Sequence, residues 1–214
     1  MGERAVKERV IQADACVAEG AAWLCKTDAR FAQALAGLPP LPLRRKPDGF
    51  AELLSAIVSQ QVSVASAKAI WGRLQAAGMI HPHTVAAASA DDLRALGLSR
   101  QKAHYAHALA TAQIDYDALR TMPACDVVKT LTAVPGIGAW TAEIYVMFSL
   151  GRADVFAPGD LALQEAARLI FDLPDRPKEK DLRVMAQAWS PWRSVAARIM
   201  WAYYKEHKQR EGIR

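Results

Sequence analysis

Cysteine is scarce in this chain, and so are metal-binding side-chain patterns. Cys16, Cys25 and Cys125 are scattered, and no two have the spacing of a zinc or redox motif. Three thiols cannot supply the four ligands of a typical iron–sulfur cluster. His104 and His107 have helical i, i+3 spacing but no acidic or thiol partner at a suitable spacing. We therefore expect a reduced, cytoplasmic protein that requires no cofactor.

Long apolar runs and strong charge bias are also missing. No uncharged apolar segment reaches transmembrane length, so we expect a soluble protein without membrane contact. The 27 basic and 22 acidic residues give a net charge of +5. This mild excess permits a phosphate-rich partner, but many soluble proteins carry as much.

Alternating β-strand patterns are absent, and helical periodicity dominates. From Phe50 to Val58 the apolar residues recur at i, i+3, i+4 and i+7, and Asp48 is the predicted N-cap of this helix. Pro and Gly fall between the helical segments. The Pro-rich stretch 38–47, which includes a basic run at 44–46, is the predicted connection between an N-terminal helical arm and the rest. The predicted fold class is all-α.

The most informative segment is Val134-Pro135-Gly136-Ile137-Gly138. Pro135 ends one helix, and Gly136 and Gly138 permit positive φ and close approach of a ligand. Backbone N–H groups at the start of the next helix then suit a phosphate oxygen. The alternative is an ordinary turn between two helices, in which the glycines serve only the fold.

Five ordered motifs together resemble the helix-hairpin-helix (HhH-GPD) DNA glycosylase superfamily, in particular its compact bacterial 3-methyladenine DNA glycosylase II type. The resemblance covers roughly residues 48–204. The motifs are Ile57–Ser63, Leu93–Lys102, Leu131–Ala142 with the hairpin, Val155–Asp160 and Trp189–Ser194.

This resemblance implies a fold of two helical lobes with the active-site cleft between them. The central lobe would span residues 48–154 and contain the helix-hairpin-helix at about 123–150. Residues 1–47 and 155–214 would form the second lobe. The implied partner is damaged double-stranded DNA, and a monomer is expected.

Asp160 follows Pro158-Gly159 and precedes an apolar helix, so the residue pattern alone predicts an N-cap. The resemblance implies a second role for Asp160 as the catalytic carboxylate. An ionised carboxylate stabilises the oxocarbenium character of the sugar as the base departs, and it orients the attacking water. The two roles are compatible, because a helix N-terminus stabilises an ionised carboxylate.

Trp140 stands where bifunctional members of the superfamily carry a Schiff-base lysine, which implies a monofunctional enzyme without lyase activity. Trp140 and Trp201 also match aromatic base-pocket positions, where stacking favours a positively charged alkylated purine. Four residues beyond Trp140, this chain has Ile144 where members of the family often have a tyrosine. The alternative for Trp140 and Trp201 is core packing, which is the predicted role of Trp189 and Trp192.

Several further positions follow from the resemblance. Gln60 and Gln61 match the junction that inserts a wedge into the duplex, although a simple helix–helix turn is the alternative. The resemblance also implies a monovalent cation, Na⁺ or K⁺, on the main-chain carbonyls of Thr132, Val134 and Ile137. Phosphate contacts are expected at the hairpin and the start of the next helix, at Gly136, Gly138 and Thr141. Arg100, Lys102 and Arg193 are either phosphate contacts or solvated charges, and the basic run 44–46 is interpreted as surface.

The predicted function is hydrolysis of the N-glycosidic bond of alkylated purines, of the 3-methyladenine or 7-methylguanine type, in duplex DNA. Base excision repair would begin with this step. One alternative keeps the fold but takes deaminated or oxidised bases. Another is a non-catalytic helix-hairpin-helix DNA-binding module. The sequence does not rank the lesions.

Overall fold

The computed structural model describes residues 8–210 and divides the chain into two compact units. Unit 1 combines residues up to Arg45 with those from Val146 onward, and unit 2 is Lys46–Tyr145. Both are helical, and no strand longer than an isolated bridge occurs within residues 8–210. The all-α prediction is confirmed. The units meet in sequence at 45/46 and 145/146, whereas the predicted lobe boundaries lie at 47/48 and 154/155.

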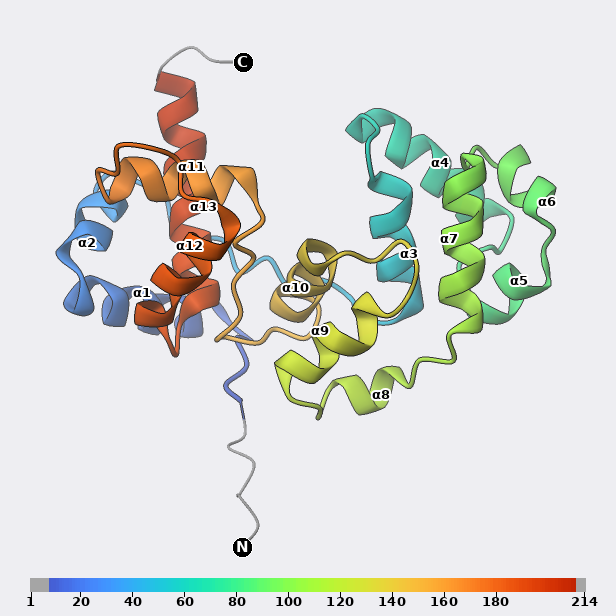
Figure 1. Cartoon of the computed structure of the whole chain (residues 1–214), viewed down its shortest axis with the longest axis horizontal. Helices are drawn as coiled ribbons and strands as arrows, with labels where there is room; N and C mark the ends of the chain where they lie inside the picture. The colour runs from blue at the N-terminus through green and yellow to red at the C-terminus, as the bar shows by residue number, and fades with distance from the viewer. Residues whose placement is uncertain (1–7, 211–214) are drawn as a thin grey trace, which may run out of the picture. The chain divides into compact units, whose positions relative to one another are not determined.

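Unit 1 is organised around α13 (Arg193–Arg210), with α11 (Leu161–Ile170), α1 (Asp14–Thr27) and α2 (Ala29–Leu35) packed against it (Figure 1). The remaining elements are α12 (Glu179–Met185) and the 3-10 helix η1 (Ala186–Trp189). An isolated antiparallel bridge between Val10 and Arg152 joins the N-terminal segment to the loop after α10. The N-terminal arm and the C-terminal helices thus share one core.

Aromatic rings fill the centre of unit 1. Trp189, which is 4% exposed, stacks on Phe171 with ring centroids 5.5 Å apart. Phe31 and Phe156 meet the same indole edge-on, at 5.7 and 5.2 Å. Trp192 is 2% exposed. The predicted packing roles of Trp189 and Trp192 are confirmed, and these contacts connect α2, η1 and the end of α11.

Unit 2 consists of short helices packed around α3 (Phe50–Ser59) and α7 (Arg100–Thr111). The apolar face of α3, from Phe50 to Val58, is buried, as the periodicity predicts. The other helices are α4 (Val64–Ala76), α5 (Pro82–Ala87), α6 (Ala90–Ala95), α8 (Tyr116–Leu119), α9 (Ala124–Thr132) and α10 (Ala139–Phe148), whose last residues belong to unit 1. Within residues 8–210, no helix is long and apolar enough to cross a bilayer.

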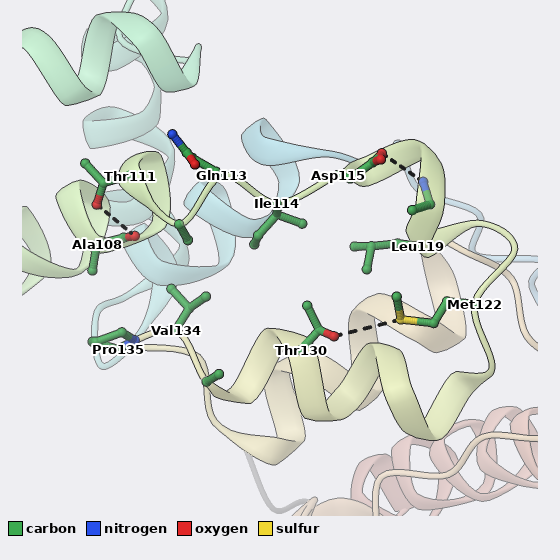
Figure 2. A pocket seen from close by; sticks show the side chains of 13 residues that line it. Ala108, Thr111, Gln113, Ile114, Asp115, Leu119, Met122, Thr130, Val134 and Pro135 are labelled. Carbon is green, nitrogen blue, oxygen red and sulfur yellow. Dashed lines mark hydrogen bonds between the residues drawn. The ribbon is translucent and has the colours of Figure 1, made fainter.

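A cavity of about 630 Å³ lies between α9 and the segment that connects α7 to α8 (Figure 2). Its lining is mostly apolar and includes Val134 and Pro135. The carboxylate of Asp115 caps α8 through the N–H groups of Asp117 and Ala118, at 3.1 and 2.9 Å. The one acidic group of this cavity is thus engaged in holding a helix, so the cavity is a weak candidate for catalysis.

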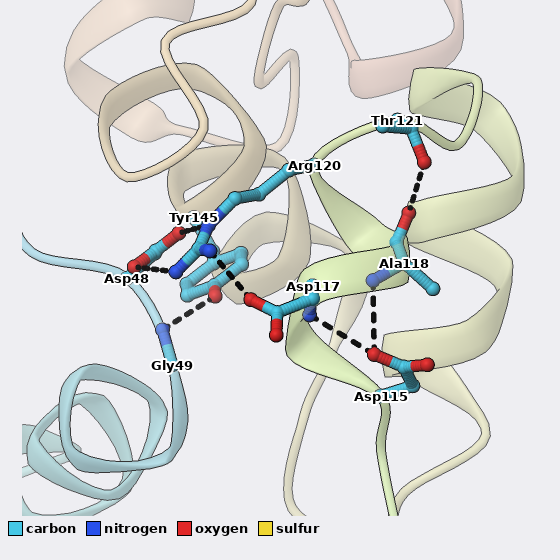
Figure 3. Close-up of polar contacts among 8 residues, drawn as sticks. All are labelled: Asp48, Gly49, Asp115, Asp117, Ala118, Arg120, Thr121 and Tyr145. Atoms are coloured by element: carbon cyan, nitrogen blue, oxygen red, sulfur yellow. Dashed lines mark hydrogen bonds and ion pairs between the residues drawn. The ribbon is translucent and has the colours of Figure 1, made fainter.

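The N-terminus of α3 differs from the prediction at Asp48. The N-cap is Gly49, with φ +94°, and Asp48 instead pairs with Arg120 of the α8 region, Oδ2 to Nε at 2.6 Å and Oδ1 to Nη2 at 3.1 Å (Figure 3). The Gly49 N–H donates to the phenol oxygen of Tyr145 at 2.7 Å. Burial raises the pKa of Tyr145 to about 12. The Asp48 cap prediction was wrong because a long-range cation competes for the carboxylate.

Candidate active site

Asp160 is the N-cap of α11, as predicted. Its Oδ1 accepts the backbone N–H groups of Ala162 at 2.9 Å and Leu163 at 3.1 Å. The Gln164 N–H in turn donates to the Asp160 main-chain carbonyl at 3.0 Å. Two backbone donors and the positive end of the helix therefore hold this half-buried carboxylate in one direction.

Trp201 of α13 supplies a third donor to the same oxygen. Its indole Nε1–H donates to Asp160 Oδ1 at 3.2 Å. The Trp201 ring lies 5.7 Å from that of Phe148, at an interplanar angle of 35°, and the guanidinium carbon of Arg44 lies over it at 5.7 Å from the centroid. Unlike Trp189 and Trp192, Trp201 is only half-buried. It is a polar partner of the predicted catalytic carboxylate as well as an aromatic surface.

In unit 2 the hairpin begins where α9 ends. The Val134 N–H donates to Leu131 O and the Ile137 N–H to Val134 O, both at 3.1 Å, which turns the chain sharply. Gly136 has φ +92°, and a Cβ built on it would lie 2.4 Å from the Tyr105 ring. The fold therefore requires glycine at position 136 for two reasons: the positive φ, and the close contact with Tyr105 of α7.

Gly138 behaves differently from Gly136. Its φ lies outside the positive region that favours glycine, and a Cβ built there would meet no atom within 4 Å. Of the positive φ that both glycines permit, only Gly136 makes use. Within the described residues, neither backbone strain nor packing requires glycine at position 138. The missing side chain leaves open space in which a bound partner could approach the backbone.

Helix α10 follows directly, and its first turn contains two predicted site residues. The Ala142 N–H donates to Gly138 O at 3.0 Å, so the N–H groups of the preceding residues are at the helix start, where intrahelical acceptors are missing. Trp140 is 47% exposed, an unusual exposure for a large aromatic side chain. Thr141 is 7% exposed, so a phosphate contact there would involve its backbone N–H rather than its hydroxyl.

The two glutamines between α3 and α4 point to different places. Gln60 Nε2 donates to the Gly136 carbonyl at 2.9 Å and so ties this turn to the hairpin. Gln61 is exposed and has φ +54°, a left-handed conformation that is strained for a residue with a Cβ. Of the two predicted wedge residues, Gln61 is exposed, whereas Gln60 is half-buried. Val62 and Val64 beside it are 39% and 87% exposed.

Lys102 of α7 lies close to the same turn. Its ammonium donates to the Val58 carbonyl at the end of α3, at 2.7 Å, and burial lowers the pKa of Lys102. A polar cavity of about 280 Å³ is lined by Gln60, Gln61, Val62, Ser99, Gln101, Lys102 and Tyr105. Lys102 thus stabilises a helix C-terminus, and its ammonium has three donors, of which this bond uses one.

Arg193 is neither a solvated charge nor open for phosphate. Its Nε and Nη2 bond the two carboxylate oxygens of Asp154 at 2.7 and 2.9 Å, and Ser190 Oγ donates to Oδ2 of the same residue at 2.8 Å. Burial alone would raise the pKa of Asp154, but the hydrogen bonds from Arg193 and Ser190 hold it below its ordinary value. This pair is structural.

The hairpin offers oxygen ligands of the kind that a monovalent cation accepts. Thr132 is the last residue of α9, where helix carbonyls lack intrahelical partners, and Val134 O accepts one N–H, which leaves its second lone pair. The Gly136 carbonyl is already used by Gln60. The donor set of Thr132, Val134 and Ile137 fits Na⁺ or K⁺, which take oxygen ligands.

The predicted site residues thus form two groups. Unit 1 brings together Asp160 and Trp201. Unit 2 brings the hairpin and Gln60 together through a hydrogen bond and also contains the exposed Trp140 and Gln61. Arg44 beside Trp201 is a residue that sequence reasoning missed, because the two positions lie 157 residues apart and meet only through the fold. The one local feature at Arg44 is the proline-rich segment before it, which does not indicate a partner.

The family is decided by comparison with known proteins. The model of the HhH-GPD superfamily of base excision DNA repair proteins matches residues 54–194. This chain belongs to that superfamily. The crystal structure of a DNA-3-methyladenine glycosidase from Bacillus halodurans is 32% identical, covers 94% of each chain and has a TM-score of 0.80. The Schizosaccharomyces pombe 3-methyladenine DNA glycosylase in complex with abasic DNA is 25% identical, covering 89% of this chain and 97% of that one with a TM-score of 0.72.

Among curated relatives of this HhH-GPD protein, DNA-3-methyladenine glycosylase 2 of Escherichia coli is 32% identical over 181 residues, 78% of this chain and 61% of that protein. Bacillus subtilis YfjP is 34% identical over 124 residues, 56% of this chain and 43% of YfjP. The chain therefore spans less than two thirds of either relative.

Proposed function

We propose that this HhH-GPD protein is a monofunctional DNA glycosylase that removes alkylated purines from duplex DNA by hydrolysis and leaves an abasic site. The observation that carries the proposal is the Asp160 carboxylate, held at the N-terminus of α11 by two backbone N–H groups and the Trp201 indole N–H. A capping role alone needs only the backbone donors. The relatives named as 3-methyladenine glycosylases support the choice of alkylated purine.

In the proposed reaction the C–N glycosidic bond breaks, and its electron pair leaves with the base. Negative charge on Asp160 stabilises the cationic sugar. Water then adds to C1′, and its proton passes to Asp160 or to solvent. The Trp201 N–H bond fixes the direction of the carboxylate without neutralising it. A cationic alkylpurine leaves as a neutral base, so no strong general acid is required.

Trp140 supports hydrolysis over Schiff-base chemistry. An indole has no nucleophilic amine, so position 140 cannot form a covalent adduct with the sugar. The 47% exposed ring is instead suited to stacking against a base. Trp140 in unit 2 and Trp201 in unit 1 are each proposed as an aromatic surface for a purine base.

We propose that unit 2 holds the DNA backbone and the opened stack. The unhindered Gly138 and the N–H groups of the first turn of α10 suit a phosphate oxygen, as does the remaining capacity of the Lys102 ammonium. Exposed Gln61 is the proposed wedge in the space of the flipped nucleotide. The proposed functional state is a monomer on damaged double-stranded DNA.

A monovalent cation on the carbonyls of Thr132, Val134 and Ile137 would hold the hairpin in its DNA-binding shape and add positive charge beside the phosphate. Duplex affinity measured at constant ionic strength should be higher in KCl than in tetramethylammonium chloride. Equal affinity in the two salts would contradict an ion at the hairpin.

The function is tested with duplexes that contain 7-methylguanine, 3-methyladenine or hypoxanthine. The wild-type protein should release the methylated bases, and alkali should be needed to cut the strand afterwards. Asp160→Asn should abolish release while retaining the fold, because Asn is an equally good N-cap. Asp175→Asn, at an exposed acid of the same unit, is the matched control and should keep full activity.

Each proposed element has an outcome that contradicts it. Trapping of a covalent DNA complex with borohydride would overturn the hydrolytic mechanism. Release of hypoxanthine alone would favour the deaminated-base alternative. Duplex binding without release of any base would leave a DNA-binding module.

A further inference from the structure

Arg44 lies in an unexpected position next to Asp160 and Trp201. It belongs to the segment between α2 and α3 and has φ +53°, a left-handed backbone that is unfavourable for an L-residue with a Cβ. The preceding carbonyl, that of Leu43, accepts two bonds from Arg198, from Nε at 3.3 Å and Nη2 at 2.9 Å. Arg198 is 1% exposed. A buried side chain therefore anchors the backbone from which Arg44 projects.

The side chain of Arg44 lies over the Trp201 indole, with Cζ 5.7 Å from the ring centroid. The edge of that indole donates to Asp160 Oδ1. Arg44 as a whole is exposed, and the partial burial of its guanidinium lowers the pKa of this side chain. The cation thus covers an aromatic face whose orientation is set by the proposed catalytic carboxylate.

Electrostatic repulsion opposes this arrangement. Burial, followed by the charges of Arg44 and Arg45, lowers the pKa of Arg198 to about 10. Arg44 and Arg45 are therefore each near enough to repel the guanidinium of Arg198, and the backbone of Arg44 is strained as well. The contact with Trp201 is the favourable interaction identified for this side chain, since a cation over an indole is stabilised by the ring quadrupole.

A cationic purine would use the same property of the Trp201 ring. We propose that Arg44 is a specificity-determining residue: its guanidinium occupies the cation-binding face of Trp201, and a positively charged base must displace it, whereas a neutral base can accept hydrogen bonds from it. The inference rests on the proposed function and on Trp201 as a wall of the base pocket. Arg44 reduces the preference for charged over neutral lesions and so broadens the substrate range.

The test compares single-turnover release of 7-methylguanine, which is cationic in DNA, with release of hypoxanthine, which is neutral. A cation–π contact corresponds to roughly a twofold to thirtyfold change in rate. Arg44→Ala should therefore raise the ratio of the two rates by about tenfold. Arg45→Ala removes a neighbouring positive charge that does not lie over the indole, and it should leave the ratio within about twofold. Equal ratios for wild type and Arg44→Ala, or equal increases in the two variants, would overturn the proposal.

Two further measurements keep the test decisive. Arg44→Gly removes the guanidinium while tolerating the left-handed backbone, so it replaces Arg44→Ala if that variant unfolds. Binding of free 7-methylguanosine at pH 6, where this nucleoside is cationic, should tighten in Arg44→Gly, and binding of inosine should not. If the wild type released no base, the proposed function would fail, and nucleoside binding would still decide the role of Arg44. Unchanged affinity for 7-methylguanosine would reject it.

Discussion

The side-chain amide of Gln60 donates to the main-chain carbonyl of Gly136 at 2.9 Å, which joins the turn after α3 to the hairpin after α9. The bond connects residues 76 positions apart inside unit 2. It gives adjacent glutamines separate roles, since Gln61 projects from the same turn into solvent. This hydrogen bond thereby links the hairpin, which is proposed to hold a phosphate, to the turn that is proposed to open the base stack.

Gln60→Ala is expected to lower the free energy of unfolding by about 1 kcal/mol, because a half-buried hydrogen bond is lost. Urea denaturation measures the change. Gln61→Ala should leave stability unchanged, because the exposed Gln61 side chain makes no comparable bond and alanine carries the same Cβ in this left-handed backbone. A stability loss in Gln61→Ala as large as that in Gln60→Ala would contradict the division of roles.

Gln61→Ala is also expected to slow excision more strongly from a matched duplex than from one in which the lesion faces a mismatch. A mismatched base is easier to flip, so it depends less on a wedge. Single-turnover rates on the two duplexes measure the difference. Lys68→Ala, on the exposed surface of α4, is a suitable control variant. Equal slowing on both duplexes would argue against insertion.

The two hairpin glycines should respond differently to alanine. Gly136→Ala is expected to destabilise the protein by at least about 1 kcal/mol, because φ is +92° and the Tyr105 ring occupies the space of the new Cβ. Gly138→Ala should change stability by less than about 0.5 kcal/mol and yet weaken duplex binding. Thermal unfolding and fluorescence anisotropy measure the two quantities. Full DNA affinity in a folded Gly138→Ala variant would exclude a close phosphate at this position.

Substitution of Asp160 separates capping from catalysis. Asp160→Ala should lose about 1 kcal/mol of unfolding free energy, because two backbone N–H groups lose their acceptor. Asp160→Asn should lose far less, since an amide oxygen also caps. Both variants should be inactive in base release. Activity retained in Asp160→Asn would mean that the negative charge is not needed.

The Asp154–Arg193 pair predicts a pH dependence of stability. The pKa of Asp154 in the folded protein lies below its ordinary value of 3.8. Its contribution is therefore fully present above that value and is lost as the pH falls through the lowered pKa. Asp154→Asn should destabilise the protein by about 2 kcal/mol near neutral pH. The gap between the unfolding free energies of the two proteins should narrow at about pH 3 and below, and a gap that widened in acid would contradict the assignment.

Local sequence signals predicted most of the helices and the cap at Asp160, because periodicity and capping depend on residues within a turn or two. They failed where distant groups compete. Asp48 is a suitable cap by sequence, but its carboxylate pairs with Arg120, and Gly49 is the N-cap of α3. Gly138 resembles Gly136 in the motif, yet only the structure shows which one the fold requires.

The charged residues were the hardest to predict. By sequence, Arg193 fits a phosphate contact as well as a solvated charge, but in the structure it pairs with Asp154, 39 positions away. The sequence places Arg44 in a surface run, whereas its position over Trp201 depends on a backbone anchor provided by Arg198. Basic side chains are long and find partners across the fold, so their sequence neighbours say little about their role.

The open space in front of Gly138 has an evolutionary consequence. Mutations at most positions near a binding site are filtered by folding and by function together, and the two pressures are hard to separate. At Gly138 the fold imposes neither a glycine-only angle nor a steric limit. Differences at this position among natural homologues should therefore reflect selection for nucleic-acid binding and not for folding.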